Sequence, residues 1–265
     1  MDYSIEYNSL YEYEEEVVVN ENILRVVPYD GDNQKVKQSL VFTEPKGYMT
    51  SFTDMFGNKV YRSKILEPHR SLIIGSRSEV SVVPKEFHDF DFPHKYGFDE
   101  FLLPSHLIDP SFFKGISQEL VRGLKTYREV LEGVVKFVRE RINYKPGITT
   151  VETKANEAFS LGVGVCQDFT HVTIGILRSL GIPSRYVMGV VNDEPRTTHA
   201  WVEVKMPDNT FAEIDPTRGI LFNLAYIKFA VGRDFKDVSP VKGWFISKGR
   251  GRLRELSIKV KKIAD

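Results

Sequence analysis

The fold is decided by the stretch Gly162-Val163-Gly164-Val165-Cys166-Gln167-Asp168-Phe169-Thr170-His171, which holds the chain's only cysteine and leads into its clearest helical pattern. Apolar or small side chains then recur with the spacing of one helix face. They are Phe169, Val172, Thr173, Ile176, Leu177 and Leu180. Gly181 and Pro183 supply an end for this helix. The pattern therefore predicts that Cys166 lies in the first turn of a buried helix.

The predicted position of Cys166 suits a nucleophile. The amino end of a helix has free N–H groups and a partial positive charge of about half a unit, which favour a thiolate over a thiol. The same N–H groups can bind an oxyanion. The alternative is that Cys166 is a small buried apolar residue, as free cysteines often are.

The composition is that of an ordinary globular protein. The chain has 265 residues, of which 42% are hydrophobic and 27% charged, so it can bury a large core in one domain or two. Lys+Arg and Asp+Glu both number 36, and this balance gives no global field that would favour nucleic acid or an anionic membrane. A single cysteine excludes an intrachain disulfide and a cysteine-rich zinc site. Without a long apolar run or a signal sequence at the start, we expect a cytoplasmic protein.

Three sections are expected along the chain. Residues 1–84 contain short strands separated by turn clusters, which predicts an antiparallel β-sandwich domain. Residues 85–112 form a connector rich in phenylalanine and proline, which we expect to pack along the joint between two domains. Residues 113–265 carry helices followed by an antiparallel meander, which predicts an α+β catalytic domain that includes the basic tail as its last strand.

The remaining histidines do not indicate a metal site. His88, His94 and His106 lie in the connector at separations that match no ligand pattern, and no loop is of EF-hand type. His69 has no spaced partner and is expected to be structural. We therefore expect neither a metal nor a cofactor.

Two further residues complete the chemistry that a cysteine nucleophile needs. Cysteine hydrolases and acyl transferases use a thiolate, an imidazole and a third group that fixes the tautomer of the imidazole. His199 begins one predicted strand, and Asp215 ends the next, with a hairpin turn between them. Because the start of one strand faces the end of its antiparallel partner, the two side chains can be neighbours. Taken singly, His199 could equally be a surface histidine and Asp215 a turn cap.

Together, the segments around Cys166, His199 and Asp215 resemble the sequence motifs of the transglutaminase-like superfamily. Its cysteine motif resembles Gly164-Val165-Cys166-Gln167-Asp168-Phe169-Thr170-His171, its histidine motif His199-Ala200-Trp201-Val202-Glu203-Val204, and its aspartate motif Ile214-Asp215-Pro216-Thr217. Residues 232–240 and 3–83 are similar to a downstream segment and to the amino-terminal β domain of the bacterial and archaeal branch. One departure is Thr170, which stands where the family often has alanine.

The resemblance implies a papain-like fold and a role for each matching residue. Cys166 would be the nucleophile and an oxyanion donor through its N–H, His199 the general base and then acid, and Asp215 the group that orients His199. In the same motif, Asp168 is expected to cap the helix and His171 to lie in the core. For Arg233 and Asp234 we favour bracing the cleft over lining it.

The favoured function is attack on an amide carbonyl of a peptide or protein, through a thioester. Water would resolve the thioester in a peptidase or amidase, and an amine would resolve it in a protein-glutamine transglutaminase. We favour hydrolysis because nothing in the sequence indicates a lysine-binding tunnel. The other hypotheses are a non-catalytic binding module on the same scaffold and, more weakly, a nucleic-acid adaptor that uses the basic tail. No nucleic-acid or membrane partner is expected, and the oligomeric state is not predicted.

Overall fold

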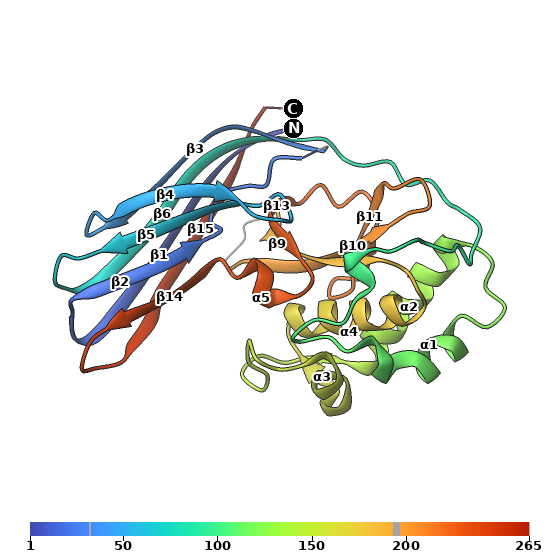
Figure 1. The fold of residues 1–265 in the computed structure, drawn as a ribbon. Helices are drawn as coiled ribbons and strands as arrows, with labels where there is room; N and C mark the ends of the chain where they lie inside the picture. The colour runs from blue at the N-terminus through green and yellow to red at the C-terminus, as the bar shows by residue number, and fades with distance from the viewer. Residues whose placement is uncertain (32, 193–196, 265) are drawn as a thin grey trace.

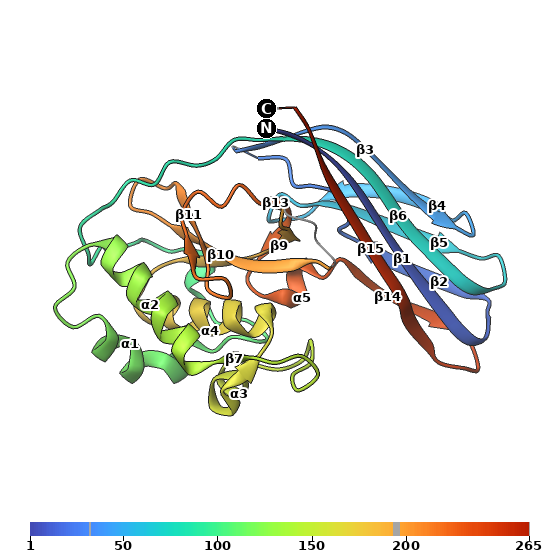
Figure 2. The same ribbon diagram turned by 180° about the vertical axis from the view of Figure 1, so that it is seen from behind.

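The computed structural model describes residues 1–31, 33–192 and 197–264 (Figure 1). A β sandwich forms one end of the molecule, and a five-stranded sheet with helices packed on it forms the other. Both chain termini lie on the sandwich, at the same end of it (Figure 2). The architecture is therefore α+β, with a β-rich unit before a helix-and-sheet core.

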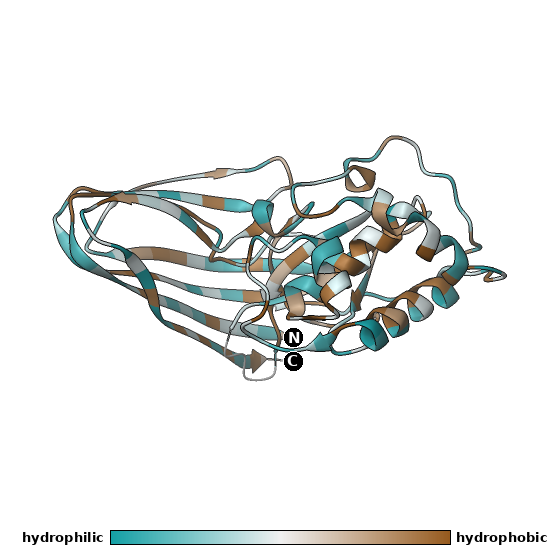
Figure 3. Cartoon of the chain, turned by 90° about the horizontal axis from the view of Figure 1, so that it is seen from below, coloured by the Kyte–Doolittle hydropathy of each residue, from teal (hydrophilic) through white to brown (hydrophobic). Residues whose placement is uncertain are grey.

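The sandwich has two four-stranded antiparallel sheets, ordered β15-β1-β6-β3 and β14-β2-β5-β4. The strands are β1 Asp2–Val17, β2 Val19–Leu24, β3 Gln34–Glu44, β4 Tyr48–Thr53, β5 Lys59–Ile65, β6 His69–Val82, β14 Val241–Ile246 and β15 Gly251–Ala264. Along β1, buried Tyr3, Ile5 and Tyr7 alternate with side chains that are only partly buried. This period of two places one row of buried side chains between the sheets. Figure 3 shows hydrophobic and hydrophilic residues mixed along the strands of the sandwich.

The last two strands, β14 and β15, belong to the sandwich and not to the helical half. This differs from the prediction, which placed all of residues 113–265 in one catalytic domain. β15 runs antiparallel to β1, with Val260 opposite Ile5, and β14 runs antiparallel to β2, with Trp244 opposite Glu21. The alternation of residues 256–261 correctly indicates a strand, but a period of two does not identify the partner of that strand. The chain thus leaves the sandwich after β6, builds the core and returns to complete both sheets.

The core sheet is ordered β12-β11-β10-β9-β13, and β7 and β8 form a separate, short parallel pair. Its strands are β9 Ser184–Val190, β10 His199–Lys205, β11 Phe211–Asp215, β12 Ile220–Leu221 and β13 Ile227–Gly232, with β7 Asn143–Tyr144 and β8 Val163–Gly164. The helices are α1 Lys114–Leu120, α2 Tyr127–Arg141, α3 Ala155–Leu161, α4 Cys166–Ser179 and α5 Phe235–Val238. None of the helices in the described residues is long and apolar enough to cross a membrane.

Helix α4 is the centre of the core because nearly all of its length is buried. From Gln167 to Arg178 every residue is buried, and α4 packs against α2, α3, β9 and β10. The amphipathic helix α2 covers it, with Val130, Leu131 and Val134 inward. A capping box between Thr126 and Glu129 fixes the start of α2. The sheet and helices thus hold α4, and the cysteine at its first position, in a rigid setting.

The connector of residues 85–112 is only partly at the joint between sandwich and core. Its first residues lie there, but the rest crosses the core (Figure 1). Phe87 stacks on Phe222 with ring centroids 3.7 Å apart, and the Tyr96 hydroxyl donates to the Lys205 carbonyl at 2.7 Å. Two short 3-10 helices, Glu100–Leu102 and Pro110–Phe113, complete it. The aromatic residues of the connector therefore serve mainly to cover the core.

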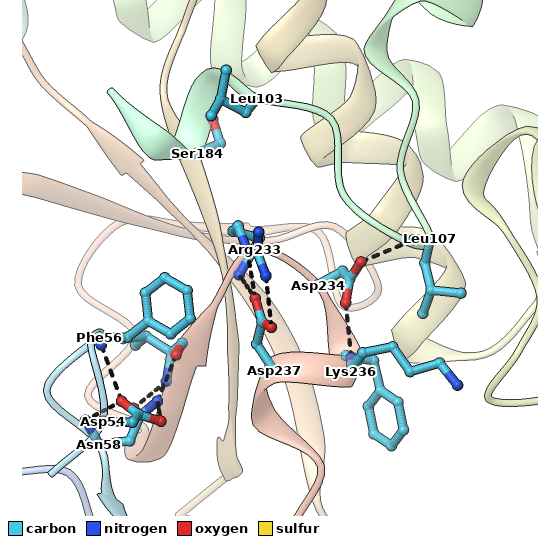
Figure 4. A network of polar contacts seen from close by, with 12 residues as sticks. Asp54, Phe56, Asn58, Leu103, Leu107, Ser184, Arg233, Asp234, Lys236 and Asp237 are labelled. Atoms are coloured by element: carbon cyan, nitrogen blue, oxygen red, sulfur yellow. Dashed lines mark hydrogen bonds and ion pairs between the residues drawn. The ribbon is translucent and has the colours of Figure 1, made fainter. Parts of the chain in front are cut away.

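Two side-chain amides join the sandwich to the free edge of β13. Gln34 Nε2 donates to the Lys228 carbonyl at 2.7 Å while its Oε1 accepts from the Lys228 N–H at 2.9 Å. Asn58 makes the same pair of bonds to Val231, both at 2.8 Å. Asp54 in turn accepts from the Asn58 amide (Figure 4). Each amide thus acts as a strand partner, so the edge of the core sheet is covered.

Candidate active site

Cys166 is the first residue of α4, as the sequence predicts. Val165, the residue before it, is extended and offers no side-chain cap. The cap comes instead from Asp168 in the first turn, whose Oδ2 accepts from the Val165 N–H and from the Thr149 hydroxyl, each at 2.7 Å. Asp168 is buried, and burial raises its pKa despite these hydrogen bonds. The expected capping role of Asp168 is confirmed, and the buried carboxylate fixes the start of the helix.

Gly164 is required by this cap. A Cβ atom at position 164 would lie 2.5 Å from the Cβ of Asp168 and 2.6 Å from its Oδ2. Both distances are far below van der Waals contact, so any other residue would push the carboxylate aside. Position 164 of the motif therefore needs glycine, because a side chain there would clash with Asp168.

His199 and Asp215 are neighbours, as the hairpin argument predicts. His199 Nε2 lies 2.8 Å from Asp215 Oδ2. The Asp215 side chain is fully buried, whereas that of His199 is 14% exposed. The backbone of His199 also pairs with Gly189 of β9, the strand on the other side of β10 from β11. The hydrogen bond to Asp215 therefore orients the imidazole ring, and the pairing with β9 holds the backbone of His199.

Cys166 also acts on the pKa of His199. Burial by itself lowers the pKa of His199, but hydrogen bonds to Asp215 and to Cys166 outweigh it and raise the pKa to about 9. Because Asp215 occupies Nε2, Nδ1 is the nitrogen that remains for the sulfur. The protonated ring can then donate to the carboxylate and to the thiolate together. His199 and Asp215 thus meet across the hairpin, and Cys166 acts on the pKa of the same imidazole.

Asp215 is held by partners that sequence reasoning missed. Its Oδ1 accepts from the N–H groups of Thr217 and Arg218 at 3.0 and 3.1 Å, and its Oδ2 accepts from the Tyr226 hydroxyl at 3.2 Å. Arg218 Nη1 donates to the same hydroxyl at 3.1 Å. Burial, followed by the charge of Asp215, raises the pKa of Tyr226 to about 12, so the hydroxyl keeps its proton. No sequence signal links Tyr226 to Asp215, because the contact depends on the turn between β11 and β13.

Two tyrosines lie near the sulfur and were also missed. Tyr186 is buried, and burial, followed by the charge of Cys166, raises its pKa. Burial and then the charge of Cys166 raise the pKa of Tyr144 as well, yet Tyr144 is 59% exposed. Cys166 itself is half-buried. The charge of Cys166 therefore acts on a buried phenol and on an exposed phenol, and the exposed one lies on the short strand β7, which pairs with β8 directly before the cysteine helix.

The other motif residues hold the core together. His171 is fully buried, its Nε2 accepts from the Phe235 N–H at 3.2 Å, and burial lowers its pKa to about 4. Asp234 accepts from the N–H groups of Leu107 and Lys236 at 2.9 and 2.8 Å (Figure 4). Arg233 forms a two-pronged ion pair with Asp237 in the same figure. Both expectations are confirmed: His171 lies in the core, and Arg233 and Asp234 brace the structure.

The remaining histidines do not gather in one place. Among residues 1–31, 33–192 and 197–264, no three His, Cys, Asp or Glu side chains come together as metal ligands would. His69 is buried in the sandwich, where its Nδ1 lies 2.7 Å from the Glu67 carbonyl and its ring packs edge-on against Tyr13. That histidine is structural, as expected.

Comparison with known proteins agrees with this arrangement. Residues 114–216 match the model of the transglutaminase-like superfamily, and residues 3–81 match the bacterial transglutaminase-like N-terminal region. An uncharacterized protein of Mycobacterium leprae is 29% identical over 260 residues, with 91% of each chain covered. An uncharacterized protein of Mycobacterium tuberculosis is 28% identical over 242 residues, which covers 78% of this chain and 75% of the relative.

A solved structure has the same fold. It is a proposed cysteine protease from Cytophaga hutchinsonii, with a TM-score of 0.84 and 20% identity, and the match covers 100% of this chain and 91% of the other. The core thus has the papain-like fold expected from the sequence, and the sandwich precedes it in both proteins. The chain thus joins a core of the transglutaminase-like superfamily, over residues 114–216, to the bacterial transglutaminase-like N-terminal region, over residues 3–81.

Proposed function

We propose that Cys166, His199 and Asp215 form a catalytic triad that hydrolyses amide bonds of a peptide or protein substrate. The observation that carries this proposal is the position of His199, whose Nε2 lies 2.8 Å from Asp215 Oδ2 and whose pKa is raised by Asp215 and then by Cys166. An imidazole held between a carboxylate and a thiol at a helix amino end is the arrangement that activates a cysteine nucleophile.

In the first step the Cys166 thiolate attacks the carbonyl carbon of the substrate, and a C–S bond forms. The electron pair of the C=O bond moves to oxygen, and the Cys166 N–H at the start of α4 lies where it can donate to this oxyanion. The C–N bond then breaks as the oxyanion returns to a carbonyl. The leaving amine takes the proton from the protonated His199, and a thioester remains on Cys166.

In the second step water resolves the thioester. Neutral His199 takes a proton from water as the hydroxyl oxygen attacks the thioester carbon, and the C–S bond breaks. The carboxylic acid leaves, and Cys166 is again a thiolate beside a protonated His199. Asp215 keeps its charge throughout, because its role is to orient the ring and to stabilise the imidazolium.

Two features support water as the acceptor. Cys166 is half-buried and not sealed in the core, which is compatible with access of water. The structural relative from Cytophaga hutchinsonii also bears the description of a proposed cysteine protease. An amine acceptor would pass through the same thioester, so transglutaminase activity is the alternative outcome of the test below.

The test is mass spectrometry of a peptide library incubated with the enzyme, with and without a small primary amine. Backbone cleavage or conversion of glutamine to glutamate, unchanged by the amine, supports hydrolysis. Attachment of the amine to glutamine instead identifies a transglutaminase. Cys166→Ser serves as the control that retains the shape of the site, and products that persist with this variant contradict the proposed triad.

A further inference from the structure

A cavity of about 560 Å³ lies at the joint between sandwich and core, at the other end of the β9–β10 ladder from His199. The sandwich contributes Tyr29 and Asn33 to its wall, the connector Lys85, and the core Arg185 and Lys228. Its volume is in the range of pockets that enclose small organic molecules. The residues of the proposed triad do not line it, so the cavity is separate from the candidate active site.

Three cations of this cavity share one carboxylate. Glu203 is fully buried beneath it, and its Oε1 accepts from Lys85 Nζ at 3.2 Å and from Lys228 Nζ. Its Oε2 accepts from Arg185, with Nη2 at 2.6 Å and Nε at 2.7 Å. The side chains of Lys85, Arg185 and Lys228 are 20%, 12% and 4% exposed. In the part of the chain that the structure describes, this network groups three basic side chains around one carboxylate in a poorly hydrated region, where burial lowers the pKa of Lys228.

The second carboxylate nearby does not balance the network. Glu213 is buried, and burial, followed by the charge of Glu203, raises its pKa. Its Oε1 accepts only a long bond of 3.5 Å from Asn33, and in the described residues its Oε2 has no hydrogen-bond partner. The other ionisable groups of the cavity are Glu86, His88 and Asp208, which are exposed at its rim. Buried charge is costly unless it is paired, so the surplus favours an additional anion.

Aromatic rings supply the rest of the recognition surface. The Arg185 guanidinium lies 3.8 Å from the centroid of the Phe211 ring, which fixes its plane, and Lys228 Nζ lies 5.6 Å from that of Tyr29. Nε and Nη2 of Arg185 bind Glu203, so that, among the described residues, Nη1 is the nitrogen left for a ligand. Lys85 Nζ is the most accessible of the three cations and has further N–H donors.

We propose that this cavity binds a small organic anion, with its carboxylate or phosphate group against Lys85 and Arg185 and its flat apolar body between Tyr29 and Phe211. Such a molecule would neutralise the surplus positive charge around Glu203. Glu203 and His199 point to the same side of β10, so the ligand would bind on the face of the sheet that also carries His199. The site would bind its ligand independently of the chemistry at Cys166.

The test is calorimetric titration of the full chain with phenylacetate, phenyl phosphate and the neutral phenylacetamide. We expect one of the two anions, or both, to bind one site, and phenylacetamide to bind at least roughly tenfold more weakly. The anion that binds better identifies the group that the site prefers. Equal affinity for charged and neutral probes, or no binding of either anion up to about 10 mM, overturns the proposal.

Two lysine variants locate the binding site. Lys85→Gln should weaken anion binding roughly tenfold. Lys64→Gln is the matched control, since Lys64 pairs with Glu21 on the outer face of the sandwich, and it should not change the affinity. Binding should also be unchanged by Cys166→Ala, which separates the cavity from the candidate active site. Equal affinities for the two lysine variants, or loss of binding in Cys166→Ala, contradict the assignment.

Discussion

His199 Nε2 and Asp215 Oδ2 lie 2.8 Å apart, and the carboxylate of this pair is completely buried. The pair determines how stability should depend on pH. The pKa of His199 is raised from 6.5 to about 9 in the folded protein, against the effect of burial, by its bonds to Asp215 and Cys166. A raised pKa means that the folded state binds the proton more tightly than the unfolded state does.

The stabilisation from His199 should therefore be complete below pH 6.5 and disappear as the pH rises through about 9. The shift corresponds to on the order of 3 kcal/mol. Urea unfolding between pH 6 and 10 should show this loss in the wild type, and His199→Gln should show a flatter profile. If stability rises across this range in a way that depends on His199, the proposed protonation state is incorrect.

The Tyr226 hydroxyl should position Asp215 and not take part in the chemistry. Tyr226→Phe removes one donor from Asp215 Oδ2, so the carboxylate should hold the His199 proton more strongly and raise its pKa further. We expect kcat on a cleaved peptide to fall several-fold while KM stays unchanged. NMR titration of the His199 ring measures the pKa directly. A variant with unchanged kcat and unchanged His199 pKa would show that the hydroxyl only fills space.

Gly164 should be intolerant of the smallest side chain. Gly164→Ala places a methyl group 2.5 Å from Asp168 and should displace the cap of α4, at a cost of roughly 1–3 kcal/mol. Gly115→Ala in α1 is the matched control, because its new methyl group meets nothing within 4 Å. The control should be neutral or slightly stabilising. Thermal unfolding compares the two, and equal melting temperatures would refute the steric role of Gly164.

Gln34 should hold the sandwich against the core. Gln34→Ala leaves both backbone groups of Lys228 without their partner, which should cost roughly 1–3 kcal/mol for each buried group. Gln38, on the same strand, is exposed, and Gln38→Ala should change stability by no more than about 0.5 kcal/mol. Equilibrium unfolding of the two variants is the measurement. A Gln34→Ala protein as stable as Gln38→Ala would mean that the amide contacts are dispensable.

The sequence predicts the start of the cysteine helix and the pairing of His199 with Asp215 because both depend on local structure. Cys166 stands two residues after Gly164 and begins a helix with one strongly apolar face, and both features can be read from the spacing of residues. His199 and Asp215 are brought together by a single hairpin, so the contact needs no long-range information. Asp168 caps its own helix and was predictable for the same reason.

Long-range contacts were not predictable. The alternation in residues 256–261 identifies a strand but not its pairing with β1 at the opposite end of the chain, and so the domain boundary differs. Tyr226 reaches Asp215 through the irregular chain between β11 and β13, which carries no periodic pattern. The amides of Gln34 and Asn58 look like ordinary polar residues, and only the structure shows that they cover a sheet edge.

Alkylation of Cys166 tests the central claim most directly, because the chain has no other thiol. Its rate with iodoacetamide, followed by mass spectrometry at pH 7, should exceed that of a free cysteine and should fall substantially in His199→Gln. A rate no faster than that of the free thiol, with no effect of His199→Gln, would contradict the claim that the histidine and the helix activate this sulfur.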